Sequence, residues 1–132
     1  MTVPVEDLWN RAKQALLLAN HDLSVSADGS ATWAYYAAFC ALSALFGLRG
    51  RSFTKHSALE TAVHRDLVKN GHWPAHLASE FTRLAQLREV GHYGGPKHVT
   101  PDEAKRSIES AAAILRAVAA AHPEAFKVDE TA

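Results

Sequence analysis

The chain has 132 residues, close to half of them apolar, and its 14 lysines and arginines are balanced by 14 aspartates and glutamates. This length suits a single domain with a substantial hydrophobic core. The zero net charge excludes the broad positive field of a general nucleic-acid binder, so any contact with phosphates has to come from a local patch.

The first half of the chain predicts two helices. The first covers residues 4–23, with Pro4 in its first turn and apolar residues spaced by three and four. After a polar segment over residues 24–29, we expect the second to begin near residue 30 or 31 and to end at the glycines of residues 47–50. It is apolar nearly all round and should be the central, most buried element. Its aromatic residues are expected in the core rather than on a base-stacking platform: Trp33, Tyr35 and Tyr36.

The second half predicts three more helices. One is expected over residues 54–69, with Thr54 or Ser57 as its N-cap, and the next opens at Pro74 and is broken by residues 94–96. The last has the clearest start, because Thr100 and Glu103 have the spacing of a capping box around a proline. The predicted fold is therefore all-α, an up-and-down bundle of about five helices in one domain. We expect its core over residues 4–121 and a frayed tail over residues 122–132.

The cellular setting is predicted from the cysteine content and from the apolar runs. The single cysteine, Cys40, excludes an intrachain disulfide, lies in an apolar run and is expected to be inert packing. No basic start followed by an apolar segment resembles a secretory signal. The longest apolar run, residues 31–48, contains Ser43 and two tyrosines and suits a buried helix better than a membrane span. We therefore expect a soluble, cytoplasmic protein.

Arg88 conflicts with the apolar pattern of its helix. At about 100° per residue, Leu77, Phe81 and Leu84 fall within about 60° of one another, and Arg88 lands in the middle of that sector. A guanidinium does not give up its proton, so on a buried stripe it needs a carboxylate, a set of carbonyls or an anionic ligand. This conflict makes Arg88 the first candidate for a functional residue.

His92 and Tyr93 follow Arg88 one turn later. Metal-free RNA cleavage needs a base, an acid and a cation, and a histidine and an arginine on one helix face are able to reach one phosphate. Because this helix offers one histidine, an acid–base pair would require a dimer, and Tyr93 would bind the phosphate or hold His92. The structural alternative is that Arg88 pairs with a buried carboxylate or caps carbonyls, while His92 and Tyr93 pack the helix end.

A short basic segment precedes the third predicted helix. Arg49, Arg51, Lys55 and His56 lie within eight residues that include no acid. Lys55 and His56 stand at a helix start, where backbone N–H groups favour an anion. These four residues are candidates for a phosphate site, with a solvated connector and a helix-capping histidine as the alternatives.

His72 and His76 have the i, i+4 spacing of a zinc site. Pro74 lies between them, and no cysteine or acid completes a set of ligands. We expect neither a metal nor a cofactor.

Several of these segments together resemble the HEPN domain family. The resemblance covers residues 9–119 and rests on the order and spacing of the motifs. They are AYYAAF at residues 34–39, the glycine-bounded basic loop, KHSAL at residues 55–59, LREVGHYG at residues 87–94 and TPDEA at residues 100–104.

The resemblance implies an up-and-down helical bundle that dimerises and is often encoded beside a minimal nucleotidyltransferase, in toxin–antitoxin or defence pairs. Many members are metal-independent ribonucleases with an Arg-x(4–6)-His motif, whose two copies face each other across the dimer. Here only three residues separate Arg88 from His92, and His92 takes the place of an aspartate in the branch that this chain resembles most.

We therefore predict a HEPN-type protein that binds nucleotide or RNA phosphates, or a partner nucleotidyltransferase, without chemistry of its own. One alternative is a metal-independent ribonuclease toxin that uses Arg88, His92 and Tyr93 across a homodimer. Another is a non-catalytic scaffold that only self-associates. The predicted ligand-binding residues are Arg88, Lys55, His56, Arg49 and Arg51.

Overall fold

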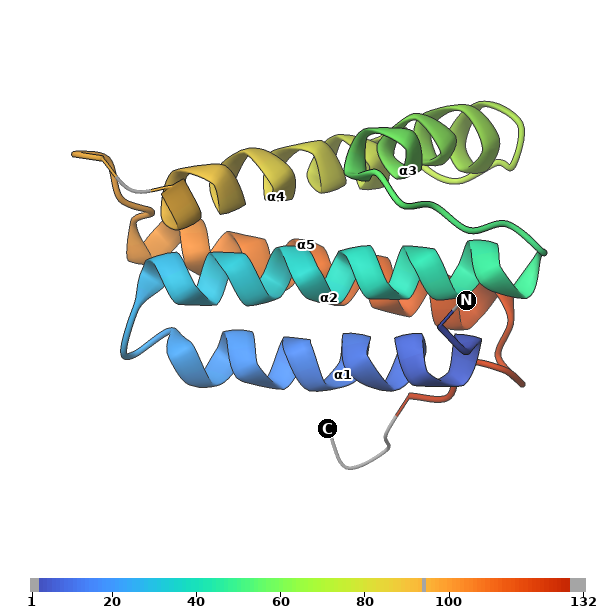
Figure 1. The fold of residues 1–132 in the computed structure, drawn as a ribbon, viewed down its shortest axis with the longest axis horizontal. Helices are drawn as coiled ribbons and strands as arrows, with labels where there is room; N and C mark the ends of the chain where they lie inside the picture. The colour runs from blue at the N-terminus through green and yellow to red at the C-terminus, as the bar shows by residue number, and fades with distance from the viewer. Residues whose placement is uncertain (1–2, 94, 129–132) are drawn as a thin grey trace.

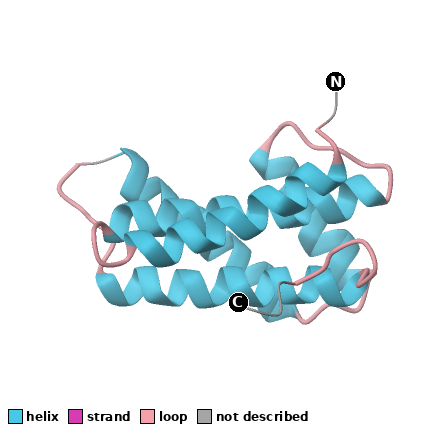
Figure 2. Cartoon of the chain, turned by 90° about the horizontal axis from the view of Figure 1, so that it is seen from below, coloured by secondary structure: helices cyan, strands magenta, loops and turns pink. Residues whose placement is uncertain are grey.

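A computed structural model of the chain describes residues 3–93 and 95–128 and is built from helices packed side by side (Figure 1). No strand occurs within this described part, which confirms the predicted all-α fold (Figure 2). The helices are α1 (Val5–Asp22), α2 (Ala27–Leu48), α3 (His56–Ala62), the π-helix η1 (Val63–Lys69), α4 (Ala75–Tyr93) and α5 (Pro101–Ala121).

Helix α2 is the centre of the bundle, as its composition predicted. It packs against α1, α4 and α5, and its many small side chains allow close approach of these neighbours: Ala34, Ala37, Ala38, Ala41 and Ala44 are fully buried. The predicted start near residue 30 or 31 is wrong. The helix begins at Ala27 because the side chain of Ser26 accepts a hydrogen bond from the Gly29 N–H and caps it.

Helix α2 is also long and apolar enough, by length and composition alone, to cross a membrane. Most of its apolar stretch is buried inside the bundle, as in the core helix of a soluble protein, so it is weak evidence for a membrane span.

The helix predicted over residues 54–69 is divided into α3 and η1. Neither expected cap is used: the N-cap is Lys55, which lies between Thr54 and Ser57, is extended and makes no side-chain capping bond. The chain turns tightly after η1. A Cβ on Gly71 would lie 2.6 Å from the Asp66 carbonyl oxygen, so this turn requires glycine, as the predicted stop implied.

Helices α4 and α5 begin where the sequence predicted. The side chain of Thr100 accepts a bond from the Glu103 N–H, and the Glu103 carboxylate accepts one from the Thr100 N–H, which confirms the capping box. The inward side chains of the two helices are buried as predicted: Leu77, Phe81 and Leu84 in α4, and Ala104, Ile108, Ala111, Leu115 and Val118 in α5.

Over residues 122–128 the structure differs from the predicted frayed tail, and residues 129–132 of that prediction lie outside the described residues. The ring of Phe126 is only 1% exposed and lies 5.1 Å from the Trp9 ring, and Trp9 Nε1 donates to the Lys127 carbonyl at 3.0 Å. The C-terminal loop therefore lies across the lower face of the bundle (Figure 2). The buried Phe126 ring and the Trp9–Lys127 hydrogen bond hold this segment against α1.

Candidate functional site

Side chains from three helices meet around the ring of Tyr35, which is 3% exposed in the middle of α2. The Phe81 ring stacks on it at 5.7 Å between centroids, and the His56 ring at 5.4 Å. The guanidinium carbon of Arg88 lies 5.6 Å from the same ring centroid. The Phe39 ring, one turn along α2, lies 4.6 Å from His56. We call these five residues the Tyr35 cluster.

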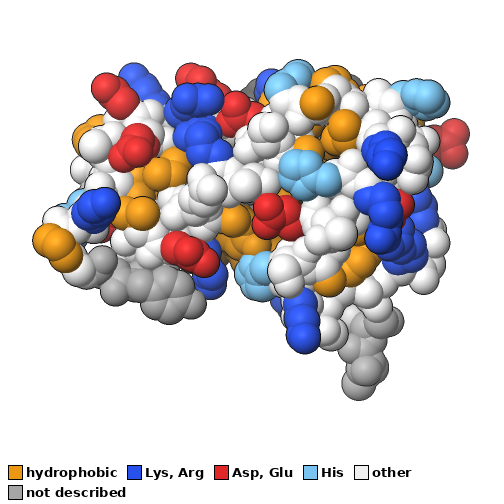
Figure 3. All heavy atoms as spheres, turned by 90° about the horizontal axis from the view of Figure 1, so that it is seen from above, with side chains coloured by type: hydrophobic (Ala, Val, Ile, Leu, Met, Phe, Trp, Pro, Cys, Tyr) orange, Lys and Arg blue, Asp and Glu red, His pale blue; other side chains and the backbone are white. Residues whose placement is uncertain are grey.

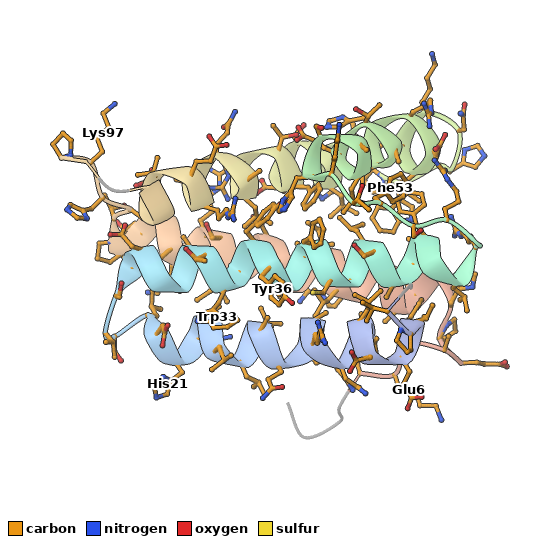
Figure 4. All side chains as sticks on the ribbon, viewed as in Figure 1. Glu6, His21, Trp33, Tyr36, Phe53 and Lys97 are labelled. Atoms are coloured by element: carbon orange, nitrogen blue, oxygen red, sulfur yellow. The ribbon has the colours of Figure 1, made fainter. Side chains whose placement is uncertain are left out.

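The helical repeat of α2 explains why this cluster forms on one side only. Tyr35 and Phe39 are one turn apart and contact α3 and α4 through His56 and Phe81. Trp33 and Tyr36 instead lie between α2 and α1, with their rings 6.0 Å apart (Figure 4). The prediction that Tyr35 is buried is confirmed, whereas Trp33 and Tyr36 are only partly buried.

Arg88 is half-buried against Tyr35, and no carboxylate among the described side chains forms an ion pair with it. A cation over an aromatic face is attracted by the ring quadrupole, but its N–H donors stay available. The contrast is Arg83 on the same helix, which binds Glu80 and Ser110 at 3.0 Å each. Of these two arginines, Arg88 is the one left for an anion.

The Tyr35 hydroxyl and His56 Nδ1 share a short hydrogen bond. Burial raises the pKa of Tyr35 to about 12, so the phenol keeps its proton. Burial, and to a smaller extent the positive charge of Arg88, lower the pKa of His56. At neutral pH the imidazole is therefore neutral, and either the phenol donates to Nδ1 or Nδ1–H donates to the phenol oxygen. The Arg88 guanidinium can only donate hydrogen bonds.

Arg51, a predicted phosphate ligand, is engaged elsewhere. Its Nη1 donates to the Asp66 carboxylate at 2.6 Å, and its guanidinium lies 5.1 Å from the Phe46 ring and 5.2 Å from the Phe53 ring. Hydrogen bonds from Arg65 and Arg51 lower the pKa of Asp66. These contacts hold the connecting segment against η1.

Of the remaining basic residues, Lys55 is exposed beside His56, while Arg49 Nε donates to His122 Nε2 at 3.3 Å at the other end of the segment. On the face that carries α3 and α4, lysine and arginine side chains gather at the end where η1 lies (Figure 3). The structure thus brings His56 and Arg88 together around Tyr35, with Lys55 adjacent, and places Arg49 and Arg51 in separate contacts.

The side chains of His92 and Tyr93 lie outside the part that the structure describes, although the backbone of α4 runs through both positions. Helices α4 and α2 come close at Gly91, where an added Cβ would lie 3.0 Å from the Asp28 carbonyl oxygen. Asp28 in turn accepts a bond from the Val99 N–H at 2.7 Å and contacts His98 Nδ1 at 2.7 Å. Helix α4 therefore packs against α2 at Gly91, three residues after Arg88.

Other candidate chemistry is not assembled in the described residues. No group of three or more histidines, cysteines, aspartates or glutamates able to hold a metal occurs there. Cys40 is 1% exposed, and burial raises the pKa of its thiol, which fits the predicted packing role.

The sequence did not identify two residues that shape the site. Tyr35 is the ring that His56, Phe81 and Arg88 contact, and Asp28 joins α2 to the segment before α5. For Tyr35 a signal was present: a buried tyrosine hydroxyl needs a partner, and an aromatic residue recurs four positions later. For Asp28 the spacing gave no signal, because its partners lie about 70 residues away.

Comparison with known proteins agrees with this fold. The HEPN domain matches residues 5–121. A "UPF0332 protein" of Thermotoga maritima is 34% identical over 84 residues, which span 64% of this chain and 64% of that protein. These matches support a function connected with nucleotides or RNA in general terms. The resemblance seen in the motifs is thus confirmed over nearly the whole bundle, and the chain belongs to the HEPN domain family.

Proposed function

We propose that the Tyr35 cluster binds the phosphate of a nucleotide or of RNA, and that the protein does no chemistry of its own. The observation that carries the proposal is Arg88, a half-buried cation on an apolar stripe without a carboxylate partner among the described side chains. An anionic ligand satisfies such a guanidinium through charge-assisted, bidentate bonds. The exposed Lys55 adds positive charge at the edge of the site.

The state of His56 favours binding over cleavage. A general base must accept a proton, and burial together with the charge of Arg88 lowers the pKa of His56, which makes its imidazole a weaker base. In the tautomer in which the Tyr35 hydroxyl donates to Nδ1, the Nε2–H of His56 donates to a phosphate oxygen. With Arg88 it makes a set of donors, which suits an anion that is bound and released unchanged.

The test is the affinity for a short single-stranded RNA, measured by fluorescence anisotropy in EDTA. We expect Arg88→Gln to weaken binding at least about tenfold, the equivalent of one charge-assisted hydrogen bond. Arg116→Gln, on the exposed face of α5, is the matched control and should bind as the parent does. Equal affinity of both variants and the parent would contradict the proposal.

The same samples, run on a gel, test the ribonuclease alternative. We expect the RNA to remain intact. Cleavage that persists in EDTA and disappears in His92→Ala would instead favour a catalytic pair of Arg88 and His92 across a dimer. A scaffold without a ligand would show no binding in any variant.

We further propose that the protein is a cytoplasmic homodimer that works with a minimal nucleotidyltransferase in a toxin–antitoxin or defence module. Family membership and the single buried cysteine support this setting. Light scattering of the purified protein should give twice the 14.3 kDa mass of one chain. A monomer at micromolar concentration would count against the dimer.

A further inference from the structure

We propose that the exposed face of His56 stacks a nucleobase, so that the ligand of the Tyr35 cluster is a nucleotide unit rather than a free phosphate. The inference rests on the proposed phosphate site and adds a second, independent contact to it. The aromatic residues of α2 were not expected to stack bases. The stacking residue proposed here is instead His56 of α3, which contacts Tyr35 and Phe39 of α2.

The ring contacts of His56 leave one of its faces open. Phe39 lies 4.6 Å and Tyr35 5.4 Å from the imidazole, with interplanar angles of 25° and 12°. If they sandwiched the imidazole, their centroids would be separated by about the sum of these distances, but the two rings are 6.1 Å apart. They therefore do not enclose the imidazole from opposite faces. Because the bond from Tyr35 to Nδ1 lies in the imidazole plane, Tyr35 is at the edge of the ring and Phe39 is on one face. Because His56 is exposed, the face opposite Phe39 is available to a ligand.

The ring is also held in place before any ligand arrives. Phe39 supports the ring on one face, and the bond between Nδ1 and the Tyr35 hydroxyl fixes its rotation. A rigid aromatic surface binds a base with little loss of conformational entropy. Stacking of this kind tolerates any base, because every base has a π-face.

The phosphate contact and the stacking contact are close enough for one nucleotide. Arg88 and His56 lie 5.6 Å and 5.4 Å from the centroid of the same tyrosine ring. In a nucleotide, a phosphate and its base are separated by a single ribose. With the phosphate on Arg88, the base can therefore reach the open face of His56, and Lys55 is positioned to meet a neighbouring phosphate of an RNA chain.

The test compares adenosine 5′-monophosphate with ribose 5-phosphate, which has the same phosphate and sugar but no base. Binding of each is measured by NMR titration. We expect the parent protein to bind the nucleotide at least about fivefold more tightly, the lower end of what one stacked base contributes. His56→Ala should reduce this preference to about onefold. His56→Phe, which keeps an aromatic face, should retain most of it.

The controls separate this inference from the proposed function. Arg88→Gln should weaken both ligands by a similar factor, and His76→Ala, an exposed histidine at the start of α4, should change neither. An unchanged preference in His56→Ala, while Arg88→Gln still weakens both ligands, would overturn the stacking alone. If Arg88→Gln affects neither ligand, or if neither binds, the phosphate site is overturned and the stacking inference with it.

Discussion

Two arginines of α4 show how the surroundings of a residue decide what it can do. Arg83 lies between α4 and α5 and bonds Glu80 and Ser110, so its charge is neutralised within the fold. Arg88, on the same helix, rests on the ring of Tyr35 without such a partner in the described part of the chain. An arginine paired with a carboxylate contributes to the fold, whereas a half-buried arginine without a carboxylate partner is available to bind an anionic ligand.

The electrostatic link between Arg88 and His56 can be measured at the level of single residues. We expect the His56 pKa, followed by NMR, to lie below the ordinary value of 6.5. Arg88→Gln should raise it only part of the way back, because burial, the larger cause, remains. Arg116→Gln should leave it unchanged. A His56 pKa that does not respond to the loss of Arg88 would show that the two groups do not interact.

For single residues, the sequence showed that Arg88 is a cation on an apolar stripe, but not that it rests on the ring of Tyr35. The position of Arg88 follows from helical periodicity alone, and the structure confirms that its neighbours Leu77, Phe81 and Leu84 are buried. The contact of Tyr35 with His56 depends on how α3 packs against α2. No local pattern fixes that packing, because the connecting segment is irregular.

Among the elements, those with a strong local signal were predicted well. The capping box of α5 and the small, apolar surface of α2 each fix an element without reference to the rest of the chain. The start of α2 was missed because the Ser26 cap was read as part of a polar loop. The division of residues 54–69 into α3 and η1 was missed because a π-helix has no reliable sequence pattern.

The C-terminal segment should contribute measurably to stability. Phe126→Ala is expected to lower the free energy of unfolding by about 3 kcal/mol, since it removes a fully buried ring beside Trp9. Val128→Ala, at a position that is 56% exposed, should change it by less than about 0.5 kcal/mol. Urea denaturation measures both. Equal stability of Phe126→Ala and the parent would mean that the tail is frayed in solution, as the sequence suggested.

The junction between α2 and the segment before α5 should depend on pH. Bonds from His98 and from the Val99 N–H lower the pKa of Asp28 below its ordinary 3.8. The folded state therefore prefers the carboxylate, which stabilises it at neutral pH, and this contribution is lost as the pH falls through the lowered pKa.

Asp28→Ala tests this junction by urea denaturation at several pH values. It should cost about 1.5 kcal/mol at pH 7, and the difference from the parent should shrink below about pH 4. Glu124→Ala, an exposed acid of the C-terminal segment, should show no such pattern. A cost that stays the same at low pH would contradict an ionised Asp28 at the junction.

On the scale of the whole molecule, a chain without net charge has to bind phosphate through a few groups. The basic segment does not act as one patch, because Arg51 is neutralised by Asp66 and Arg49 is directed to His122. We therefore propose that Arg88, His56 and Lys55 are the groups that bind phosphate. Such a site differs from the broad positive surface of a general nucleic-acid binder.

The salt dependence of RNA binding follows from this count of charges. Each phosphate neutralised on a single strand contributes about −0.7 to the slope of log K against log salt. With Arg88 and Lys55 as the cations, we expect a slope of about −1.5. A slope steeper than about −3 would point to a wide electrostatic surface that includes the arginines near η1.

The most direct test of the phosphate site is to locate the ligand by NMR in the parent protein. A short single-stranded RNA is titrated while the arginine Nε–H, histidine ring and tyrosine ring signals are followed. We predict that the largest shifts occur at Arg88, His56 and Tyr35, with little change at Arg49, Arg51 and Arg116. Largest shifts at Arg49 and Arg51, or no shifts at Arg88 and His56 with saturating RNA, would contradict the Tyr35 cluster as the binding site.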